Sequence, residues 1–157
     1  MTALNETQLA DGGDSTQCVT FYVGESLLGV PIQRIEEINR LVDLTPVPHG
    51  PACVRGVINL RGEVVTVVDL RTILGLDRLD VTRDTRNVIL NFNGEHVGLV
   101  VDRVADVVAA RNDEIDRPPA NLSGAEGGFY RGVYKLESEL MVLLNVEQVL
   151  TAGSSVA

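Results

Sequence analysis

Residues 56–71 read GVINLRGEVVTVVDLR, two β-rich runs that flank a glycine. Because glycine tolerates a positive φ, Gly62-Glu63 suits the two-residue loop of a type II′ hairpin. That loop predicts a fixed register, with Arg61 facing Val64, Leu60 facing Val65, Asn59 facing Thr66 and Ile58 facing Val67. Side chains alternate across a strand, so one face of this ribbon is apolar and the other carries the polar groups. The stretch therefore predicts a β-hairpin with a core on one side.

Arg61 stands beside this turn and is the first candidate for a recognition group. A guanidinium is planar, stays charged and grips a carboxylate with two hydrogen bonds. The competing interpretation is a solvated side chain that keeps a sheet edge soluble. Glu37 is an oppositely charged residue embedded between Ile35 and Ile38. A charged pair in an apolar rim sets the register of a protein interface, which favours a binding module over an enzyme.

The composition excludes some classes of partner and is compatible with a basic protein partner or with a salty cytoplasm. At 157 residues the chain is one domain or two small lobes, and its 45% hydrophobic content suffices for a core. A formal net charge of −9 argues against phosphate backbones and anionic membranes as partners. No apolar run approaches the roughly 18 residues of a membrane span, and the N-terminus does not resemble a signal peptide. We therefore expect a soluble cytoplasmic protein with no nucleic-acid partner and no direct membrane insertion.

Turn signals divide the rest of the chain into further hairpins. Asn93-Gly94 is a strong type I′ signal between two β-rich runs. Strict alternation breaks near Asp102-Arg103, which predicts a bulge or a sharp bend. Other hairpins are expected over 18–30 and 132–144, with one long loop over 111–128. Four hairpins and few helices predict an all-β domain, with small barrels as its architecture.

Short helices and two chain ends complete the expected layout. Asp69 is placed to cap a helix over Leu70–Leu74, and Asn145 to cap one over Val146–Leu150. The expected boundaries are a flexible tail at 1–16, a folded region at 17–152 and a frayed end at 153–157. The two central hairpins divide the chain evenly enough to suggest two lobes, although no repeat is strong enough in sequence to prove a duplication.

Residues that carry enzyme chemistry are few. No GxSxG, GxxxxGK or GxGxxG motif is present. His49 and His96 are expected to be surface polar groups, and Cys18 and Cys53 to be buried thiols. We therefore predict no catalytic residue, no metal and no cofactor. A small enzyme with dispersed catalytic groups remains the alternative, because spatial triads leave no local motif.

The stretch at 56–71 also closely resembles the signature segment of CheW-like coupling proteins, the adaptors of bacterial and archaeal chemotaxis arrays. The resemblance spans about residues 17–152 and rests on four segments in order: FYVGESLLGVPIQRIEEI, LTPVPHGPACVRGVINLRGEVVTVVDLR, VGLVVDRVADV and MVLLNVEQVL. It implies two SH3-like five-stranded β-barrels around a shared hydrophobic core. It also implies a non-catalytic scaffold that relays receptor conformation by differential binding.

Partners and a binding site follow from the same resemblance. Family members bridge the cytoplasmic hairpin tip of chemoreceptors to the regulatory domain of the histidine kinase CheA, so this chain would be cytoplasmic and recruited to membrane-associated receptor arrays. The receptor-binding positions of the family match Ile35, Glu37, Ile38, Gly56, Arg61, Gly62, Gly98, Val104 and Val107 here. Glu37 and Arg61 match an acid–arginine pair of the family. The kinase-facing surface is marked by no motif that carries over.

Several alternatives stay open at this point. The three glycines of the site are also explained by turn or close-packing geometry, and Val104 and Val107 by burial in a core. The pathway is flagellar chemotaxis, twitching motility or another receptor–kinase system. A module for proline-rich peptides is a further alternative, but it calls for a groove of several aromatics and the chain has three Phe, three Tyr and no Trp.

Overall fold

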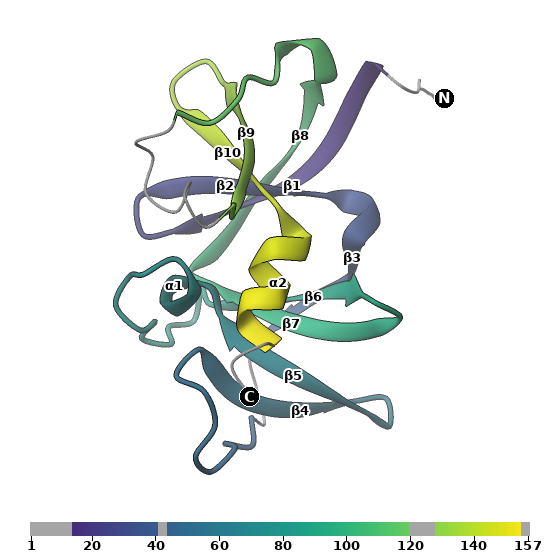
Figure 1. The fold of residues 1–157 in the computed structure, drawn as a ribbon, viewed down its shortest axis with the longest axis vertical. Helices are drawn as coiled ribbons and strands as arrows, with labels where there is room; N and C mark the ends of the chain where they lie inside the picture. The colour runs from purple at the N-terminus through teal and green to yellow at the C-terminus, as the bar shows by residue number, and fades with distance from the viewer. Residues whose placement is uncertain (1–13, 41–43, 120–127, 155–157) are drawn as a thin grey trace.

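The fold consists of two five-stranded sheets, one above the other, with short helices between them (Figure 1). The structure is a computed structural model that describes residues 14–40, 44–119 and 128–154. The first sheet has the order β8-β1-β2-β10-β9, built from β1 (Ser15–Val23), β2 (Ser26–Pro31), β8 (Arg103–Arg111), β9 (Tyr130–Lys135) and β10 (Leu140–Leu144). The second has the order β3-β6-β7-β5-β4, built from β3 (Ile35–Arg40), β4 (Val54–Leu60), β5 (Glu63–Asp69), β6 (Arg86–Phe92) and β7 (Glu95–Val101). The helical elements are α1 (Leu70–Ile73), α2 (Val146–Ser154) and the 3₁₀ turns η2 (Ile32–Arg34) and η3 (Asn112–Glu114).

Each sheet closes on itself through one isolated pair of backbone hydrogen bonds. Beyond β3, Thr45 exchanges N–H···O bonds of 2.9 and 2.8 Å with Val57 of β4. Beyond β8, Asp116 exchanges bonds of 2.9 and 2.8 Å with Val133 of β9. In each sheet these bonds join the segment that follows one edge strand to the opposite edge strand, which removes the exposed edge at that point. The prediction of two five-stranded barrels is confirmed.

The two barrels share one topology. Strands β3, β4 and β5, helix α1 and strands β6 and β7 correspond in order and direction to β8, β9, β10, α2, β1 and β2. The chain therefore forms β1 and β2 of the first barrel, then the whole second barrel, and finally β8, β9 and β10 of the first barrel. The correspondence also appears in the sequence, as VRGVINL at 54–60 and YRGVYKL at 130–136, and as GVPIQRIEEI at 29–38 and GLVVDRVADV at 98–107. This repeat is not evident along the sequence, because its two copies are related by a circular permutation.

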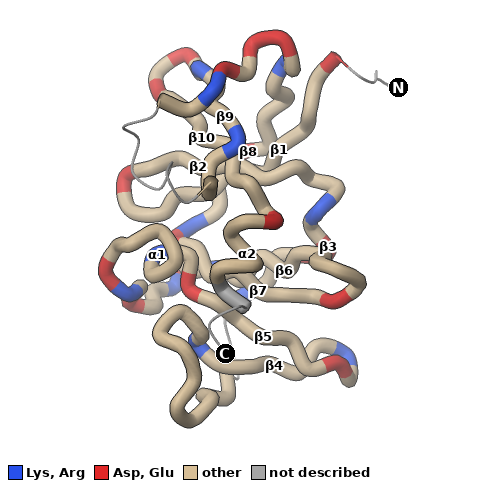
Figure 2. The backbone as a smooth tube through the Cα atoms, viewed as in Figure 1, with Lys and Arg blue, Asp and Glu red and all other residues tan. Residues whose placement is uncertain are grey.

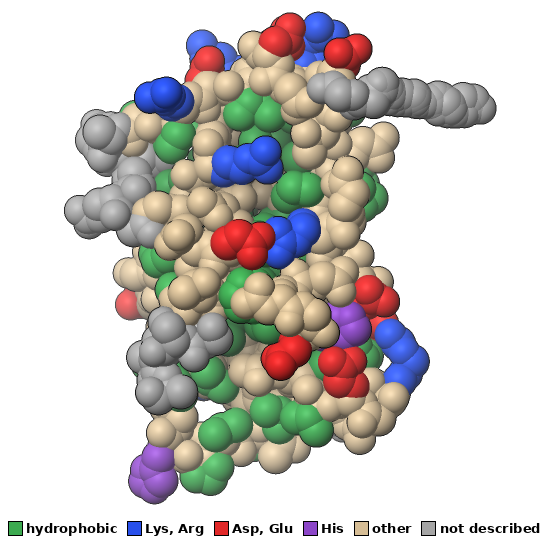
Figure 3. All heavy atoms as spheres, turned by 45° about the vertical axis from the view of Figure 1, so that its right-hand side comes forward, with side chains coloured by type: hydrophobic (Ala, Val, Ile, Leu, Met, Phe, Trp, Pro, Cys, Tyr) green, Lys and Arg blue, Asp and Glu red, His purple; other side chains and the backbone are tan. Residues whose placement is uncertain are grey.

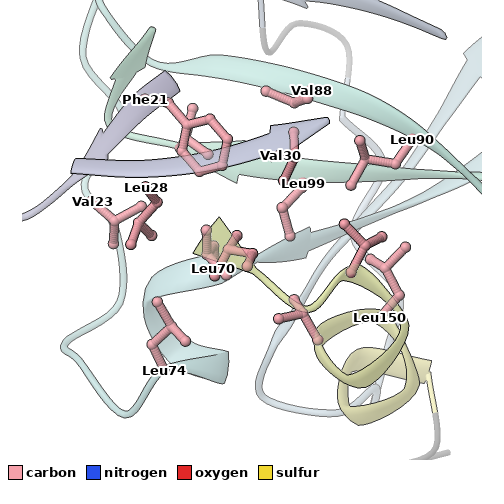
Figure 4. Packing of buried hydrophobic residues seen from close by; sticks show 14 of the residues in the cluster. Phe21, Val23, Leu28, Val30, Leu70, Leu74, Val88, Leu90, Leu99 and Leu150 are labelled. Atoms are coloured by element: carbon pink, nitrogen blue, oxygen red, sulfur yellow. The ribbon is translucent and has the colours of Figure 1, made fainter. Parts of the chain in front are cut away.

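One apolar core lies between the barrels, as expected. Its buried members come from both sheets and from both α-helices, and they include Phe21, Leu28, Leu70, Leu90, Leu99 and Leu150. Figure 4 shows these side chains pointing into the space between the strands and the helices. Each barrel interior holds a smaller cluster, around Met141 in the first barrel and around Val67 in the second. Burial of this shared core is the main force that holds the barrels together.

The expected local elements are mostly confirmed. The Asn93-Gly94 turn sets Val88 opposite Leu99 and Leu90 opposite Val97, as a type I′ loop predicts. Asp69 caps α1 by accepting a hydrogen bond of 3.0 Å from the N–H of Arg71. The final hairpin and the bend at Asp102 are present as well, and Asn145 Oδ1 accepts a bond from the N–H of Gln148 at the start of α2.

The chain ends and the long loop are described only in part. Strand β1 begins at Ser15 and α2 ends at Ser154, and the tail expected over 1–16 otherwise lies outside the described residues. In the loop expected over 111–128, residues 112–119 include η3 and the Asp116 bridge. Residues 120–127 lie outside the described residues.

The turn predicted for the first hairpin is misplaced by one residue, which shifts the register by two. The two-residue loop is Arg61-Gly62, with φ of 51° and 88°, so that Leu60 faces Glu63 and Ile58 faces Val65. These angles fit a type I′ turn, whose twist matches the twist of the flanking strands, and Asn59 Oδ1 accepts a bond of 2.8 Å from the N–H of Gly62. The apolar face keeps the same residues, because the shift moves each pairing by two positions on the facing strand. Arg61, however, stands at the apex and not on a strand.

Two ion pairs brace the segments that cross between the barrels. At the crossing from β7 to β8, Asp102 accepts two bonds from Arg71 of α1, of 3.0 and 2.8 Å, and a third of 2.8 Å from the N–H of Gly24. At the crossing from β2 to β3, Arg34 pairs with Glu147 of α2 and donates to the carbonyl of Asn91. The two arrangements occupy equivalent places in the barrel topology. The Asp102 site is better shielded, because its side chain is 23% exposed and that of Glu147 is 56% exposed.

We predict that Asp102→Ala lowers the free energy of unfolding by about 2–3 kcal/mol, since it leaves Arg71 and the N–H of Gly24 unpaired. Glu147→Ala serves as the matched comparison and should cost about 1 kcal/mol or less, because its ion pair is exposed to solvent. Urea denaturation of both variants measures the difference. Equal losses would show that the Asp102 network adds nothing beyond a surface ion pair.

Candidate docking site

The Glu37–Arg61 pair joins opposite edges of the second barrel. Glu37 lies on β3 and Arg61 at the tip of the β4–β5 hairpin, and β3 and β4 are the two outer strands of the sheet. In a flat sheet these strands would lie about 19 Å apart, beyond the reach of one arginine. In the closed barrel, Arg61 Nη2 lies 2.6 Å from Glu37 Oε1. The pairing proposed from the sequence is therefore present in the structure.

Asn39 is a second partner of Glu37. Its Nδ2 donates a hydrogen bond of 2.9 Å to Glu37 Oε2, so each carboxylate oxygen has one donor. These hydrogen bonds, from Asn39 first and then from Arg61, lower the pKa of Glu37, and the charge of His96 acts in the same direction. Glu37 is thus held in its ionised form and in one orientation. The sequence analysis missed Asn39, although its position two residues beyond Glu37 places it on the same strand face.

His96 is the other residue that the sequence analysis underrated. It was expected to be a surface polar group, and it is 25% exposed. Its Nδ1 lies 2.8 Å from Glu63 Oε1 of β5, and its Nε2 lies 3.6 Å from Glu36 Oε1 of β3. Figure 3 shows histidine, acidic and basic side chains gathered on this side of the second barrel, and Figure 2 shows basic and acidic positions adjacent at the β4–β5 tip. The charged cluster therefore spans three strands.

The remaining site residues of β3 flank the pair. Ile35 is partly buried and packs against the shared core. Ile38 is 37% exposed and follows Glu37 directly, and Gly62 is exposed beside Arg61 at the hairpin tip. The structure thus brings Glu37 and Arg61 together at the hairpin tip beside Gly62, with Ile38 next to Glu37 along β3.

Gly56 and Gly98 are buried, and their geometry supports the close-packing interpretation. A Cβ at Gly56 would lie 2.3 Å from the carbonyl oxygen of Thr45, the residue that closes the barrel. A Cβ at Gly98 would lie 2.4 Å from Oδ1 of the buried Asn87. Gly132 occupies the position equivalent to Gly56 in the first barrel, and a Cβ there would lie 2.9 Å from the Asp116 carbonyl oxygen. These glycines shape the barrels that carry the site.

Val104 and Val107 lie on β8, in the first barrel. Val104 is partly buried and packs against the shared core, as the burial interpretation expected, whereas Val107 is 56% exposed. In the barrel repeat they correspond to Ile35 and Ile38 of β3. The predicted site therefore consists of equivalent strands from the two barrels, of which only β3 carries an ion pair with its hairpin tip among the residues that the structure describes.

An open groove of about 720 Å³ lies beside the charged cluster. Its walls are mostly apolar, with Glu63, Glu95 and His96 at its polar part and Val64, Phe92, Val97 and Leu150 among the apolar residues. Val64 is the most exposed of these, at 70%. Hydrophobic side chains below the charged cluster are visible in Figure 3. Surfaces of this kind suit protein contacts.

The described residues offer little for catalysis. Both cysteines are buried thiols, and burial raises the pKa of the Cys18 thiol to about 11, so it stays protonated near neutral pH. No group of three or more His, Cys, Asp or Glu side chains within 14–40, 44–119 and 128–154 is arranged to hold a metal ion. Across the same residues, no helix is long and apolar enough to cross a membrane.

Two linked five-stranded barrels around a shared core, with a charged pair across the rim of one of them, define a two-barrel scaffold protein. The model of the CheW-like domain matches residues 17–154, so the chain belongs to the CheW-like family. Members of this family are non-catalytic adaptors in chemotaxis, and this chain is such a scaffold and not an enzyme.

Individual relatives agree with this assignment. The chain is 34% identical over 141 residues to the chemotaxis protein CheW of Rhizobium meliloti, covering 90% of both chains. It is 28% identical over 148 residues to CheW of Treponema pallidum, covering 92% of this chain and 87% of the relative. It is 35% identical over 100 residues to protein FrzA of Myxococcus xanthus, covering 63% and 62%. The crystal structure of the scaffolding protein TtCheW from Thermoanaerobacter tengcongensis superposes with a TM-score of 0.78 at 28% identity, covering 86% and 87%.

We predict that Gly56→Ala lowers the free energy of unfolding by about 3 kcal/mol or more, because the new Cβ collides with the backbone of Thr45. Gly62→Ala is the control. Gly62 has a φ of 88°, but no atom lies within 4 Å of the place that a Cβ would take, so only backbone strain of about 1 kcal/mol is expected. Chemical denaturation compares the two. Equal losses would mean that the Thr45 approach is not what requires glycine.

The lowered pKa of Glu37 predicts a pH dependence with a definite sign. Its ionised form is favoured in the folded state, so its contribution to stability is present above the ordinary glutamate pKa of 4.5 and is lost as the pH falls through the lowered value. The stability difference between wild type and Glu37→Gln should be largest at pH 7 and should narrow as the pH falls below 4.5. Glu25→Gln, in the exposed β1–β2 turn, is the control. The same pH profile for both variants would contradict the assignment.

Proposed function

We propose that this adaptor couples the cytoplasmic hairpin tip of a chemoreceptor to the regulatory domain of the histidine kinase CheA, in the cytoplasm at a receptor array. The observation that carries the proposal is the Glu37–Arg61 pair on the rim of the second barrel. A receptor tip is a bundle of helices, and a fixed charged pair near exposed apolar side chains such as Val64 of the adjoining groove selects one helical register. Family membership supports the same partners.

The pair is also suited to a signalling contact. Arg61 is 67% exposed and Glu37 is 28% exposed, so both charges stay within reach of a partner while they hold each other. Such rim charges contribute more to specificity and to association rate than to affinity. The receptor surface on this chain is proposed to be Ile35, Glu37, Ile38, Gly56, Arg61, Gly62, Gly98, Val104 and Val107, with the buried members shaping the surface from below.

A second candidate function is the same coupling role in a non-flagellar receptor–kinase pathway such as twitching motility. The likeness to FrzA, a relative whose name does not refer to chemotaxis, is compatible with it. Both functions use the same fold and the same site, and they differ in the receptor and kinase that are bound.

A three-component sedimentation assay tests the proposal. It combines the chain, a chemoreceptor cytoplasmic fragment and CheA, with kinase autophosphorylation as a parallel readout. We expect the kinase to sediment with the receptor only when the chain is present, and its activity to change in the same samples. If neither partner binds, the coupling function is refuted for that receptor and kinase, and the same assay with the components of a non-flagellar pathway tests the second candidate.

We predict that Arg61→Glu weakens receptor binding by about tenfold or more without unfolding the domain, because it places two like charges at the rim. Arg111→Glu is the matched control, since Arg111 is an exposed arginine, 58% exposed, next to Asp113 in the first barrel. Calorimetric titration with the receptor fragment measures both. Glu37→Arg combined with Arg61→Glu should restore part of the affinity, and additive losses in the double-mutant cycle would reject the pairing.

A further inference from the structure

The imidazole of His96 lies between two carboxylates that belong to different strands. Glu63 of β5 is 2.8 Å from Nδ1, and Glu36 of β3 is 3.6 Å from Nε2. Glu63 follows the Arg61-Gly62 turn and Glu36 precedes Glu37, so both carboxylates adjoin the Glu37–Arg61 pair. The β4–β5 tip is thus attached to β3 in two ways, directly through Arg61 and indirectly through His96.

The two attachments respond differently to pH. A neutral imidazole carries one N–H and can donate to one carboxylate only, so the other carboxylate faces a lone pair. The imidazolium donates from both nitrogens and carries a positive charge between the two acids. Histidine changes charge near pH 6.5, whereas the arginine of the direct attachment stays charged throughout.

We propose that His96 is a positioning residue of the docking site, which in its protonated form ties the β4–β5 tip to β3 and so makes partner binding stronger at lower pH. The inference rests on the proposed receptor contact through Arg61 and Glu37. A tip that is already fixed in its bound position loses less conformational freedom on binding. The binding affinity therefore rises as the pH falls from 8 to 6.

The other charged groups around His96 come from β3, β5 and β7 and from the hairpin tip. Glu37 lies on β3 next to Glu36, and the positive charge of His96 helps to lower its pKa. Glu95 precedes His96 on β7, and Arg61 at the turn is held by Glu37. On the β6 side the partner is the uncharged Asn91, whose carbonyl accepts a bond from Arg34, itself paired with Glu147. Acidic groups thus predominate on the β3 and β5 sides of the ring.

The first test is the pH profile of receptor binding. Wild type should bind a chemoreceptor cytoplasmic fragment about three- to tenfold more tightly at pH 6 than at pH 8, and His96→Gln should lose that dependence. His49→Gln, at the exposed histidine of the proline-rich connector, is the control and should keep the wild-type profile. Because every variant meets the same fragment, titration of receptor groups cancels. Identical profiles for wild type and His96→Gln would overturn the inference, whereas no binding at any pH would refute the receptor function itself.

The second test needs no partner. The N–H of Gly62 donates to Asn59 Oδ1 at 2.8 Å, so its nitrogen–proton NMR signal reports on the hairpin tip. In wild type this signal should shift between pH 6 and 8, and in His96→Gln it should not. A signal that is unchanged in wild type, or that shifts equally in both proteins, would show that His96 does not control the tip. Thermal unfolding at each pH confirms that the variant is folded.

Discussion

The pair of backbone hydrogen bonds between Thr45 and Val57 is the constraint on which the candidate site depends. Without it, β3 and the β4–β5 hairpin would be opposite edges of an open sheet. With it, the sheet curls until an arginine at one edge reaches a carboxylate at the other. Gly56 is part of this constraint, because a side chain at that position would fill the space that the Thr45 carbonyl occupies. Closure of the barrel therefore brings the two halves of the site within reach of each other.

The first barrel is closed by equivalent backbone hydrogen bonds but has different charges at the equivalent positions. Asp116 and Val133 close it with the same two bonds, and Gly132 allows the same close approach. In the repeat, Glu37 corresponds to Asp106, and the tip residue Arg61 corresponds to Glu137. Two acids at these positions cannot pair, so no counterpart of the Glu37–Arg61 bridge is expected in the first barrel. Both barrels therefore have the backbone geometry for such a bridge, but only the second barrel has opposite charges at the two positions.

Much of this arrangement was predictable from the sequence, and the failures have physical causes. Alternation, Asn-Gly chemistry and helix caps identified the strands, the second hairpin and α1, because these signals are local. The turn at Arg61-Gly62 was misplaced because an arginine in the left-handed region is unfavourable by itself and is retained by its surroundings. The pairing of Glu37 with Arg61 was found from charge and apolar context. Asn39 was overlooked although it lies on the same strand, and Glu36, Glu63 and His96 were not found because their meeting depends on the strand order β3-β6-β7-β5, which no local pattern encodes.

The proposed docking surface includes strands from both barrels. A partner that touches both strands therefore depends on the relative orientation of the barrels. Ile38 and Val107 occupy equivalent strands on different barrels, and each is exposed. Their separation is set by the shared core and by the crossings, where Arg71 grips Asp102 and Arg34 grips Glu147. A packed core resists gradual deformation, and the ion pairs hold the crossings at their ends. The core and the crossings therefore fix the placement of the two barrels relative to each other, so a partner that touches both loses little conformational entropy from this source when it binds.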